Sequence, residues 1–362
     1  MKILDWYIIK KLLITFVFCM LIFTIIAVAV DTSEKTDDFV KTGLSTSEII
    51  TEYFFGFIPH IWGLLFPLFV FIAVIFFTSS MAAKSEIISI LASGVSFNRL
   101  LRPYFIGGIF LAGVIWYANR YIIPKANVIR SDFEATYFDN KNPGETLDFT
   151  SSYYLQTDTH TYAGIKYYDT AQKKSSGFFL EKIYDNKVNY NLRADAMVWD
   201  TAKKNWRLDN VIIRKIDGLN ETVVKIPDTI INLNMQPRDL RKDQYLKDKM
   251  TTPELKEFIR WQELRGVEGL NTLKVEQYRR SATPVTVLIL TLIGAVIASR
   301  KTRGGSGVHM AIGIAIAAIF IIADRFSTVF SIKGDLPPLI AAWMPNLVFI
   351  IVAFVLYKKA QK

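Results

Sequence analysis

The three histidines are the side chains best suited to bind a metal, but they lie far apart in the sequence. His60, His160 and His309 fall in different predicted elements, so each is expected to be a lone structural or surface histidine. The single cysteine, Cys19, lies inside an apolar run, which excludes a disulfide framework or a cysteine-based metal site within one chain. We therefore predict no metal site and no cofactor.

Motifs for nucleophilic or metal-assisted hydrolysis are absent from the sequence, namely G-x-S-x-G, H-E-x-x-H and C-x-x-C. The glycine-rich loop RGGSG at Arg303–Gly307 lacks the following Gly-Lys-Ser/Thr of a phosphate-binding loop. The chain is therefore not predicted to be an enzyme. If it performs energised work, a partner must hydrolyse the ATP.

The composition is that of a membrane protein. Of the 362 residues, 51% are hydrophobic without counting glycine, which exceeds the average for globular proteins. The net charge of +10 could indicate nucleic acid, but no basic cluster with interleaved aromatic residues lies away from the apolar runs. Basic residues beside membrane spans are better explained by topology, so no nucleic acid is expected as a partner.

Six apolar runs meet the length of about 20 residues that a membrane span requires. They are Leu12–Val30, Phe54–Thr78, Tyr104–Ile123, Pro284–Ser299, Val308–Phe330 and Leu339–Tyr357. The first is interpreted as a retained span, because no small-residue cleavage site follows it. Near one end of the fifth, Asp324 and Arg325 are interpreted as a structural pair in preference to a proton relay.

Lysine and arginine are concentrated in alternate loops, which predicts the orientation. Basic residues precede span one, lie between spans two and three, separate spans four and five, and end the chain. The opposite loops are acidic or poor in charge. The positive-inside rule therefore places both termini in the cytoplasm and the long interval between spans three and four outside.

Between spans two and three, Ser79–Pro103 predicts a short, half-polar helix. Ser79 and Ser80 are suited to cap its start, and Gly94 is suited to end it with a positive φ. Apolar residues recur at spacings of three and four, while Glu86 points elsewhere. One reading is an ordinary loop between spans, and the other is a docking helix for a soluble partner at about 79–97.

The external interval predicts an all-β domain, a sandwich or jelly roll, at residues 124–250. Its short segments are rich in Tyr, Phe, Val, Ile and Thr and are separated by turn residues. The segments are Ser152–Gln156, Thr161–Tyr168, Gly177–Tyr184, Asn189–Trp199, Trp206–Ile216 and Glu221–Leu233. Their open edges are either a surface for strand addition by a partner or simply blunted edges.

The remaining domains follow from these boundaries. Residues 1–123 hold spans one to three and 281–362 hold spans four to six. Between the β domain and span four, 251–280 is predicted as a helical linker. It opens at Thr251–Glu254 with a capping residue and a proline in the first turn, and ends near Gly266. A second basic piece, Leu273–Arg280, leads into span four.

Span five carries small residues at every fourth position, Gly307, Ala311 and Ala315. Small side chains at this spacing let two helices approach closely in a membrane. They are expected either to pack against another helix of this chain or to form a seam with a second subunit, which could open as a lateral gate.

Several segments in the same order resemble the YjgP/YjgQ permease family, the LptF/LptG subunits of the lipopolysaccharide export ABC transporter. They are LDWYIIKK at Leu4–Lys11, SEIISILASGVSFNRLLRP at Ser85–Pro103, MTTPELKEFI at Met250–Ile259, RRSATP at Arg279–Pro284 and GDLPPLIAAWMPNLVF at Gly334–Phe349. The opening segment and VKTG after span one favour the LptG side. The resemblance covers essentially the whole chain.

The resemblance implies a six-span α-helical permease with a jelly-roll-like periplasmic domain, in the bacterial inner membrane. Its implied partners are cytoplasmic ATPase subunits, a second homologous permease and periplasmic bridge proteins of jelly-roll type. Lipopolysaccharide would enter laterally from the outer leaflet between the two permeases and pass to the bridge.

The resemblance also assigns residues. Glu86 would face the ATPase, with Leu91, Ala92 and Gly94 in the packed part of the coupling helix. Spans one and five would line the gate. Lys35 and Lys41, just outside span one, would meet lipid phosphates.

Two other classes are considered beside a transporter. A membrane scaffold or sensor would bind an external ligand through the β domain without an ATPase. An intramembrane lipid enzyme would need polar or ionisable residues clustered at one depth, and the sequence shows no such cluster.

Overall fold

The computed structural model describes residues 3–138, 153–158, 160–169, 173–184, 187–201, 205–218, 220–233, 237, 246–264, 269–300 and 305–360. The chain divides into two compact units, a helical unit and a β unit. The helical unit comprises Met1–Arg130, Lys247–Leu255 and Asn271–Lys362, and the β unit comprises Ser131–Leu246 and Lys256–Leu270. The short segment Lys247–Leu255 therefore belongs to the helical unit, although both its flanks belong to the β unit.

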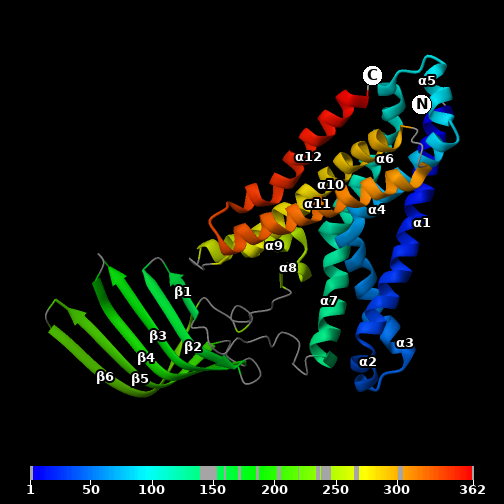
Figure 1. The fold of residues 1–362 in the computed structure, drawn as a ribbon. Helices are drawn as coiled ribbons and strands as arrows, with labels where there is room; N and C mark the ends of the chain where they lie inside the picture. Colours follow the sequence, from blue (N-terminus) through cyan, green and yellow to red (C-terminus); the bar gives the residue numbers. More distant parts are fainter. Residues whose placement is uncertain are drawn as a thin grey trace. The chain divides into compact units, whose positions relative to one another are not determined.

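Six long apolar helices form the helical unit and confirm the six predicted spans (Figure 1). They are α1 (Ile3–Glu34), α4 (Phe55–Ala83), α6 (Phe97–Tyr117), α10 (Asn271–Ala298), α11 (Gly305–Lys333) and α12 (Pro338–Ala360). The shorter α2 (Thr36–Thr42) and α3 (Thr46–Ile49) follow α1, and α7 (Ile123–Phe133) follows α6. Helices suit these sequences because lipid cannot satisfy backbone N–H and C=O groups.

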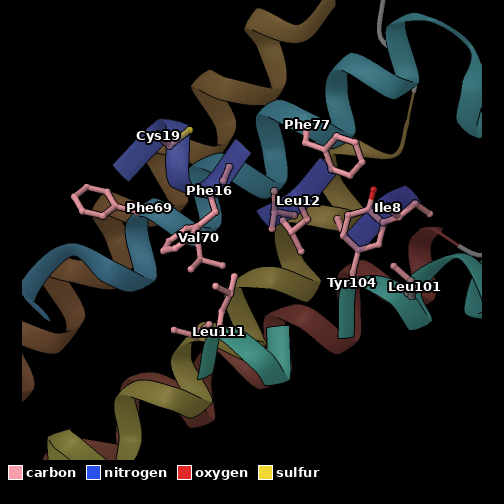
Figure 2. Close-up of a cluster of buried hydrophobic side chains, with 14 of the residues drawn as sticks. Ile8, Leu12, Phe16, Cys19, Phe69, Val70, Phe77, Leu101, Tyr104 and Leu111 are labelled. Atoms are coloured by element: carbon pink, nitrogen blue, oxygen red, sulfur yellow. The ribbon is translucent and has the colours of Figure 1, made fainter. Parts of the chain in front are cut away.

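The first three long helices share one packed core, which Figure 2 shows in close-up. Ile8 and Leu12 of α1 are fully buried, and they pack with Val70 of α4 and with Tyr104 and Leu111 of α6. Lipid tails are as apolar as these side chains, so close van der Waals packing holds the helices together.

A second core joins α4 to the last three long helices. Phe71 and Ile75 of α4 pack with Ile293 of α10, Ala317 of α11 and Phe349 of α12. Helix α4 thus contributes to both cores, and it links the two halves of the helical unit that the β unit separates in sequence.

The linker before span four differs from the sequence-based expectation. The predicted piece Leu273–Arg280 and the predicted span Pro284–Ser299 form one continuous helix, α10. Pro284 lies inside this helix and does not end it. Beside it, Thr283 Oγ1 donates a hydrogen bond to the Arg279 carbonyl at 2.8 Å. The predicted opening of the preceding helix is confirmed in α9 (Thr252–Leu264), where Thr251 N and Oγ1 donate to Glu254 Oε2 at 2.9 and 2.7 Å.

The β unit contains one antiparallel sheet whose strands follow chain order. The strands are β1 (Tyr153–Asp158), β2 (Thr161–Asp169), β3 (Lys174–Tyr184), β4 (Lys187–Asp200), β5 (Asn205–Asp217) and β6 (Asn220–Ile231). Each overlaps one predicted segment, which confirms the all-β domain inserted between the third and fourth spans. Ser152 and Gly266, two of the predicted boundaries, lie outside the described residues.

One face of this sheet is apolar and buried. Ile165, Phe178, Ala194 and Val211 are paired in register across β2 to β5, and each is at most 5% exposed. Alternation along each strand places these side chains on the same face. They form the core of the β unit.

The two-sheet sandwich expected from the sequence is not present among the described strands. Two residues separate β3 from β4 and two separate β5 from β6, so these neighbours pair directly as antiparallel hairpins. A jelly roll needs long crossover connections between its strands. The described strands instead form a meander.

Candidate functional site

The predicted short helix after the second span is present as α5 (Glu86–Ala92), but it begins later than expected. Helix α4 continues through Ala83, so Ser79 and Ser80 lie inside it and the capping role predicted for them was wrong. The chain turns at Ser85, whose φ of 60° is in the left-handed region. In Figure 1, α5 lies at the end of the helical unit where both chain termini are found.

The predicted end of this helix is confirmed at Gly94. Its φ is 87°, a left-handed conformation that glycine adopts without steric cost, and its N–H donates to the Leu91 carbonyl at 3.1 Å. A β-carbon at this position would contact nothing within 4 Å, so the space around Gly94 is open.

Helix α5 rests on the first core through one side of its surface. Ile87 is 1% exposed, and Leu91 packs partly against the same cluster. Ala92 and Gly94 are exposed, so of the three predicted packed residues Leu91 alone packs within this chain. Ile88 is 48% exposed and adds an apolar side chain to the free side of the helix.

A two-pronged ion pair joins α1 to the start of α6. Arg99 Nη1 and Nη2 donate to Asp5 Oδ1 and Oδ2 at 2.6 and 2.7 Å. Asp5 is 4% exposed, and the two residues are 94 positions apart in sequence. The planar guanidinium matches a carboxylate in this geometry, which fixes orientation as well as distance. We call this contact the terminal ion pair.

Glu86 also contacts α1 within this chain. The Tyr7 hydroxyl donates to Glu86 Oε2 at 3.2 Å, at an exposed position. Asp5 and Tyr7 belong to LDWYIIKK, whereas Glu86 and Arg99 belong to SEIISILASGVSFNRLLRP. The two segments, distant in sequence, therefore lie against each other.

The last span is attached at the same place. The Tyr357 hydroxyl of α12 donates to Asn98 Oδ1 of α6, and the Tyr357 and Phe97 rings lie 6.4 Å apart. Glu86 was predicted as a site residue, whereas the contacts of Asp5, Tyr7, Arg99 and Tyr357 were not predicted. The available signal was an acidic residue, Asp5, in the short basic segment that precedes the first long apolar run.

The two predicted phosphate-binding lysines have different environments. Lys35 is half-buried; it lies 3.2 Å from Asp31 and its Nζ donates to the Tyr53 hydroxyl. Lys41 is 74% exposed and lies 3.6 Å from Asp38. An exposed ion pair of this kind contributes about 0–1 kcal/mol, so Lys41 can readily exchange its partner.

The small residues of α11 face outward from this chain. Gly307, Ala311 and Ala315 are all exposed, so the alternative that they pack against another helix of this chain was wrong. The close approach occurs at Gly313 instead, where an added β-carbon would lie 2.3 Å from Ile75 Cδ1 of α4.

Two long helices are notably uncovered in the chain by itself. In their most apolar windows α1 is 11% buried and α11 is 17% buried, compared with 61% for α10. The most apolar parts of α1 and α11 are thus the least covered among the six long helices.

A cavity of about 220 Å³ lies within the helical unit between α4, α7, α10, α11 and α12. One side of its lining is apolar, with Leu68, Leu290 and Phe320, and the other is ionic. Asp324 and Arg325 lie on the ionic side with Glu276 and Arg279, which form an ion pair at 2.6 Å. No group of three His, Cys, Asp or Glu side chains able to hold a metal occurs in the described ranges.

The chain matches a family model described as lipopolysaccharide export system permease LptF/LptG over residues 6–359. Curated proteins gave no match. The matched region includes all six apolar helices and the inserted sheet. The chain therefore belongs to the LptF/LptG family of lipopolysaccharide export permeases.

Proposed function

We propose that this protein is the permease subunit that extracts lipopolysaccharide from the outer leaflet of the inner membrane and passes it to a periplasmic bridge. A separate cytoplasmic ATPase supplies the energy. Beyond family membership, the observation that carries this proposal is the attachment of α5 to α1 through the Tyr7–Glu86 hydrogen bond, beside the terminal ion pair that joins α1 to α6. Force applied to α5 can reach a long, uncovered helix through these contacts.

In this proposal α5 is the ATPase-coupling helix. Its buried Ile87 anchors it to the helical unit, while Glu86, Ala92 and Gly94 are available on the outside. Small residues at the last two positions leave room for a partner surface. The positive-inside distribution of Lys and Arg supports a cytoplasmic position for α5 and both termini.

A second homologous permease is proposed to cover the outer faces of α1 and α11. The exposed Gly307, Ala311 and Ala315 give α11 a surface that another helix can approach closely. Two such seams would form gates through which lipid enters, and their small contact side chains would let them separate without a large loss of packing.

The lipid phosphates are proposed to meet Lys41 in the last turn of α2, the short helix that follows α1. Its side chain is exposed and weakly paired, whereas Lys35 is already bound to Asp31 and Tyr53. Lys35 is therefore proposed to orient this segment, and Lys41 to exchange Asp38 for a phosphate.

The bridge is proposed to join the sheet at β6. Among the described strands β6 pairs with β5 alone, and Val223, Val224 and Ile230 are 46–54% exposed. An edge strand with exposed apolar side chains favours strand addition by a domain of similar fold.

The coupling role is tested by Glu86→Arg in the reconstituted complex with its ATPase and second permease. We expect a folded, membrane-inserted protein in which ATP hydrolysis no longer drives lipid movement. A photo-crosslinker at Ile213, on the apolar face of the sheet, should capture lipid in the wild type when ATP is supplied and should fail to do so in the variant.

Tyr7→Phe is the comparison variant, because it removes the intrachain hydrogen bond and leaves Glu86 in place to meet the ATPase. We expect it to lower ATP-driven transport, but by less than Glu86→Arg does. Unchanged transport by Glu86→Arg would contradict the coupling role proposed for Glu86. Equal crosslinking with and without nucleotide in the wild type would argue against energised transport. If the chain is active when it is purified without an ATPase, the scaffold or sensor alternative is favoured.

A further inference from the structure

The chain returns from the β unit to the helical unit at α8 (Leu246–Lys249), a helix of four residues. Lys247–Leu255 belongs to the helical unit, whereas the residues on both sides of it belong to the β unit. We call Lys247–Leu255 the return segment. Its backbone is covalently continuous with the β unit in both directions, so whatever holds it also holds two of the points at which the chain passes between the two units.

Side chains of two other helices bind the carbonyl groups of the return segment. Arg280 of α10 donates through Nη2 to the Lys247 carbonyl at 2.6 Å and through Nη1 to the Met250 carbonyl at 2.8 Å. Asn127 of α7 donates to the Asp248 carbonyl at 2.9 Å. The last carbonyl groups of a helix have no partner within it, so these donors satisfy groups that would otherwise be orphaned.

Arg280 is itself held in place. It is 7% exposed, and its Nε donates to Glu276 Oε1 at 3.1 Å one turn earlier in α10. Glu276 also pairs with Arg279 at 2.6 Å. We call the Glu276–Arg280 contact the junction ion pair. With Nε bound to the carboxylate, the two terminal nitrogens are aimed at the return segment in a fixed fork, which a lysine cannot reproduce.

Three segments noted in the sequence converge here. Arg280 of RRSATP binds Met250 of MTTPELKEFI, and Asn346 of GDLPPLIAAWMPNLVF donates to the Ala282 carbonyl at 3.0 Å. Asn346 Oδ1 in turn accepts from Thr286 Oγ1 at 2.8 Å. The middle of α10 is therefore fixed both to α12 and to the return segment.

We propose that Arg280 is a positioning residue that fixes the return segment to α10, so that movement of the spans is passed to the β unit. The proposal rests on the proposed function, because lipid must be handed from the spans to the sheet. Arg280 contacts backbone carbonyl groups and contributes to transport through the position of the segment it holds.

The test is Arg280→Ala in the full complex, with three measurements. Hydrogen exchange of residues 246–255 should become about tenfold faster, because opening of this segment no longer breaks two hydrogen bonds to a charged donor. ATP hydrolysis should stay within about twofold of the wild type, because α5 and the terminal ion pair are untouched. ATP-dependent crosslinking of lipid at Ile213 should fall about tenfold, while capture by a crosslinker placed next to Lys41 in α2 persists.

Two further variants keep the test decisive. Arg280→Lys retains the charge beside Glu276 and should fall between the wild type and Arg280→Ala in both exchange and transfer. Arg260→Ala, on the exposed side of α9, is the matched control and should change neither.

Unchanged exchange and unchanged transfer in Arg280→Ala would overturn the proposal. So would a loss of ATP hydrolysis and of lipid capture in Arg280→Lys equal to the loss of transfer, since that result indicates general damage to the fold. Failure of the wild-type complex to move lipid would instead contradict the proposed function, and the exchange measurement would still report on the Arg280 contact.

Discussion

The two ends of the helical unit are each held by a guanidinium–carboxylate contact, and the two contacts differ in what they join. The terminal ion pair links side chains on α1 and α6, with Arg99 27% and Asp5 6% exposed at the side chain. The junction ion pair lies within α10, with Arg280 7% and Glu276 12% exposed, and its arginine binds backbone carbonyl groups.

The two contacts therefore differ in whether they can exchange partners. The terminal ion pair can, whereas the junction ion pair fixes the chain. Water reaches Arg99, so its carboxylate partner can be replaced by another anion or by solvent as helices move. Losing Arg280 would leave the Glu276 carboxylate without one of its partners and would free the carbonyl groups of Lys247 and Met250 from their guanidinium donor, which is costly. We infer that the helices can shift relative to one another at the α5 end. At the return segment the contact does not exchange, so movement of α10 is passed on to that segment.

Glu276→Ala is expected to have the largest effect, because it leaves the buried guanidinium of Arg280 and the partly exposed one of Arg279 without the Glu276 carboxylate. Removing one partner of a buried pair costs about 3–5 kcal/mol, so the melting temperature of the purified protein in detergent should fall clearly. Glu276→Gln keeps a hydrogen-bond acceptor of the same size and should lose less. Equal stability of Glu276→Ala and the wild type would show that the two contacts do not differ as described.

Asp5→Ala is expected to affect coupling more than stability. We expect ATP-driven lipid transfer to fall about fivefold, because α1 loses its two-pronged contact to α6. The charge-swapped double variant Asp5→Arg with Arg99→Asp should recover part of the activity. If the loss in transfer were matched by a large loss in melting temperature, the terminal ion pair would resemble the junction ion pair and the comparison would fail.

The smallest expected effect concerns Glu254 at the start of α9. Hydrogen bonds from the Thr251 hydroxyl and N–H lower the pKa of Glu254 below its ordinary value of 4.5. A lowered pKa means that the stabilisation is fully present above pH 4.5 and is lost as the pH falls through the lowered pKa.

Glu254→Gln supplies the measurement for this pH dependence. Amide exchange at the start of α9 should be faster in Glu254→Gln than in the wild type at pH 7, and the two should converge once the pH falls below the lowered pKa of Glu254. A difference that stayed constant across this range would show that the charge of Glu254 does not stabilise the cap.

Much of the fold follows from local patterns in the sequence. The six apolar runs became six helices because lipid permits few alternatives, and each predicted strand segment overlaps an observed strand because turn residues punctuate alternating ones. The stop at Gly94 and the cap at Thr251 were also predictable, since both depend on residues within one turn. The start of α5 was not, because Ser79 and Ser80 are suited both to a cap and to the interior of a buried helix.

Less of the candidate site was predictable. The sequence marked Glu86 and the small residues of α11, but it left open which way Gly307, Ala311 and Ala315 face, since the same spacing suits packing within a chain or between chains. Lys35 and Lys41 looked equivalent, and the burial of Lys35 against Tyr53 distinguished them.

Hydropathy, charge bias and ordered motifs along the chain were sufficient to predict the membrane class, the number of spans, the inserted β domain and the family. The tertiary structure alone decided which distant residues meet: Asp5 with Arg99, Tyr7 with Glu86, and Arg280 with the return segment. Each of these contacts joins residues at least 30 positions apart. No periodicity or local propensity encodes them, because they depend on how the helices pack.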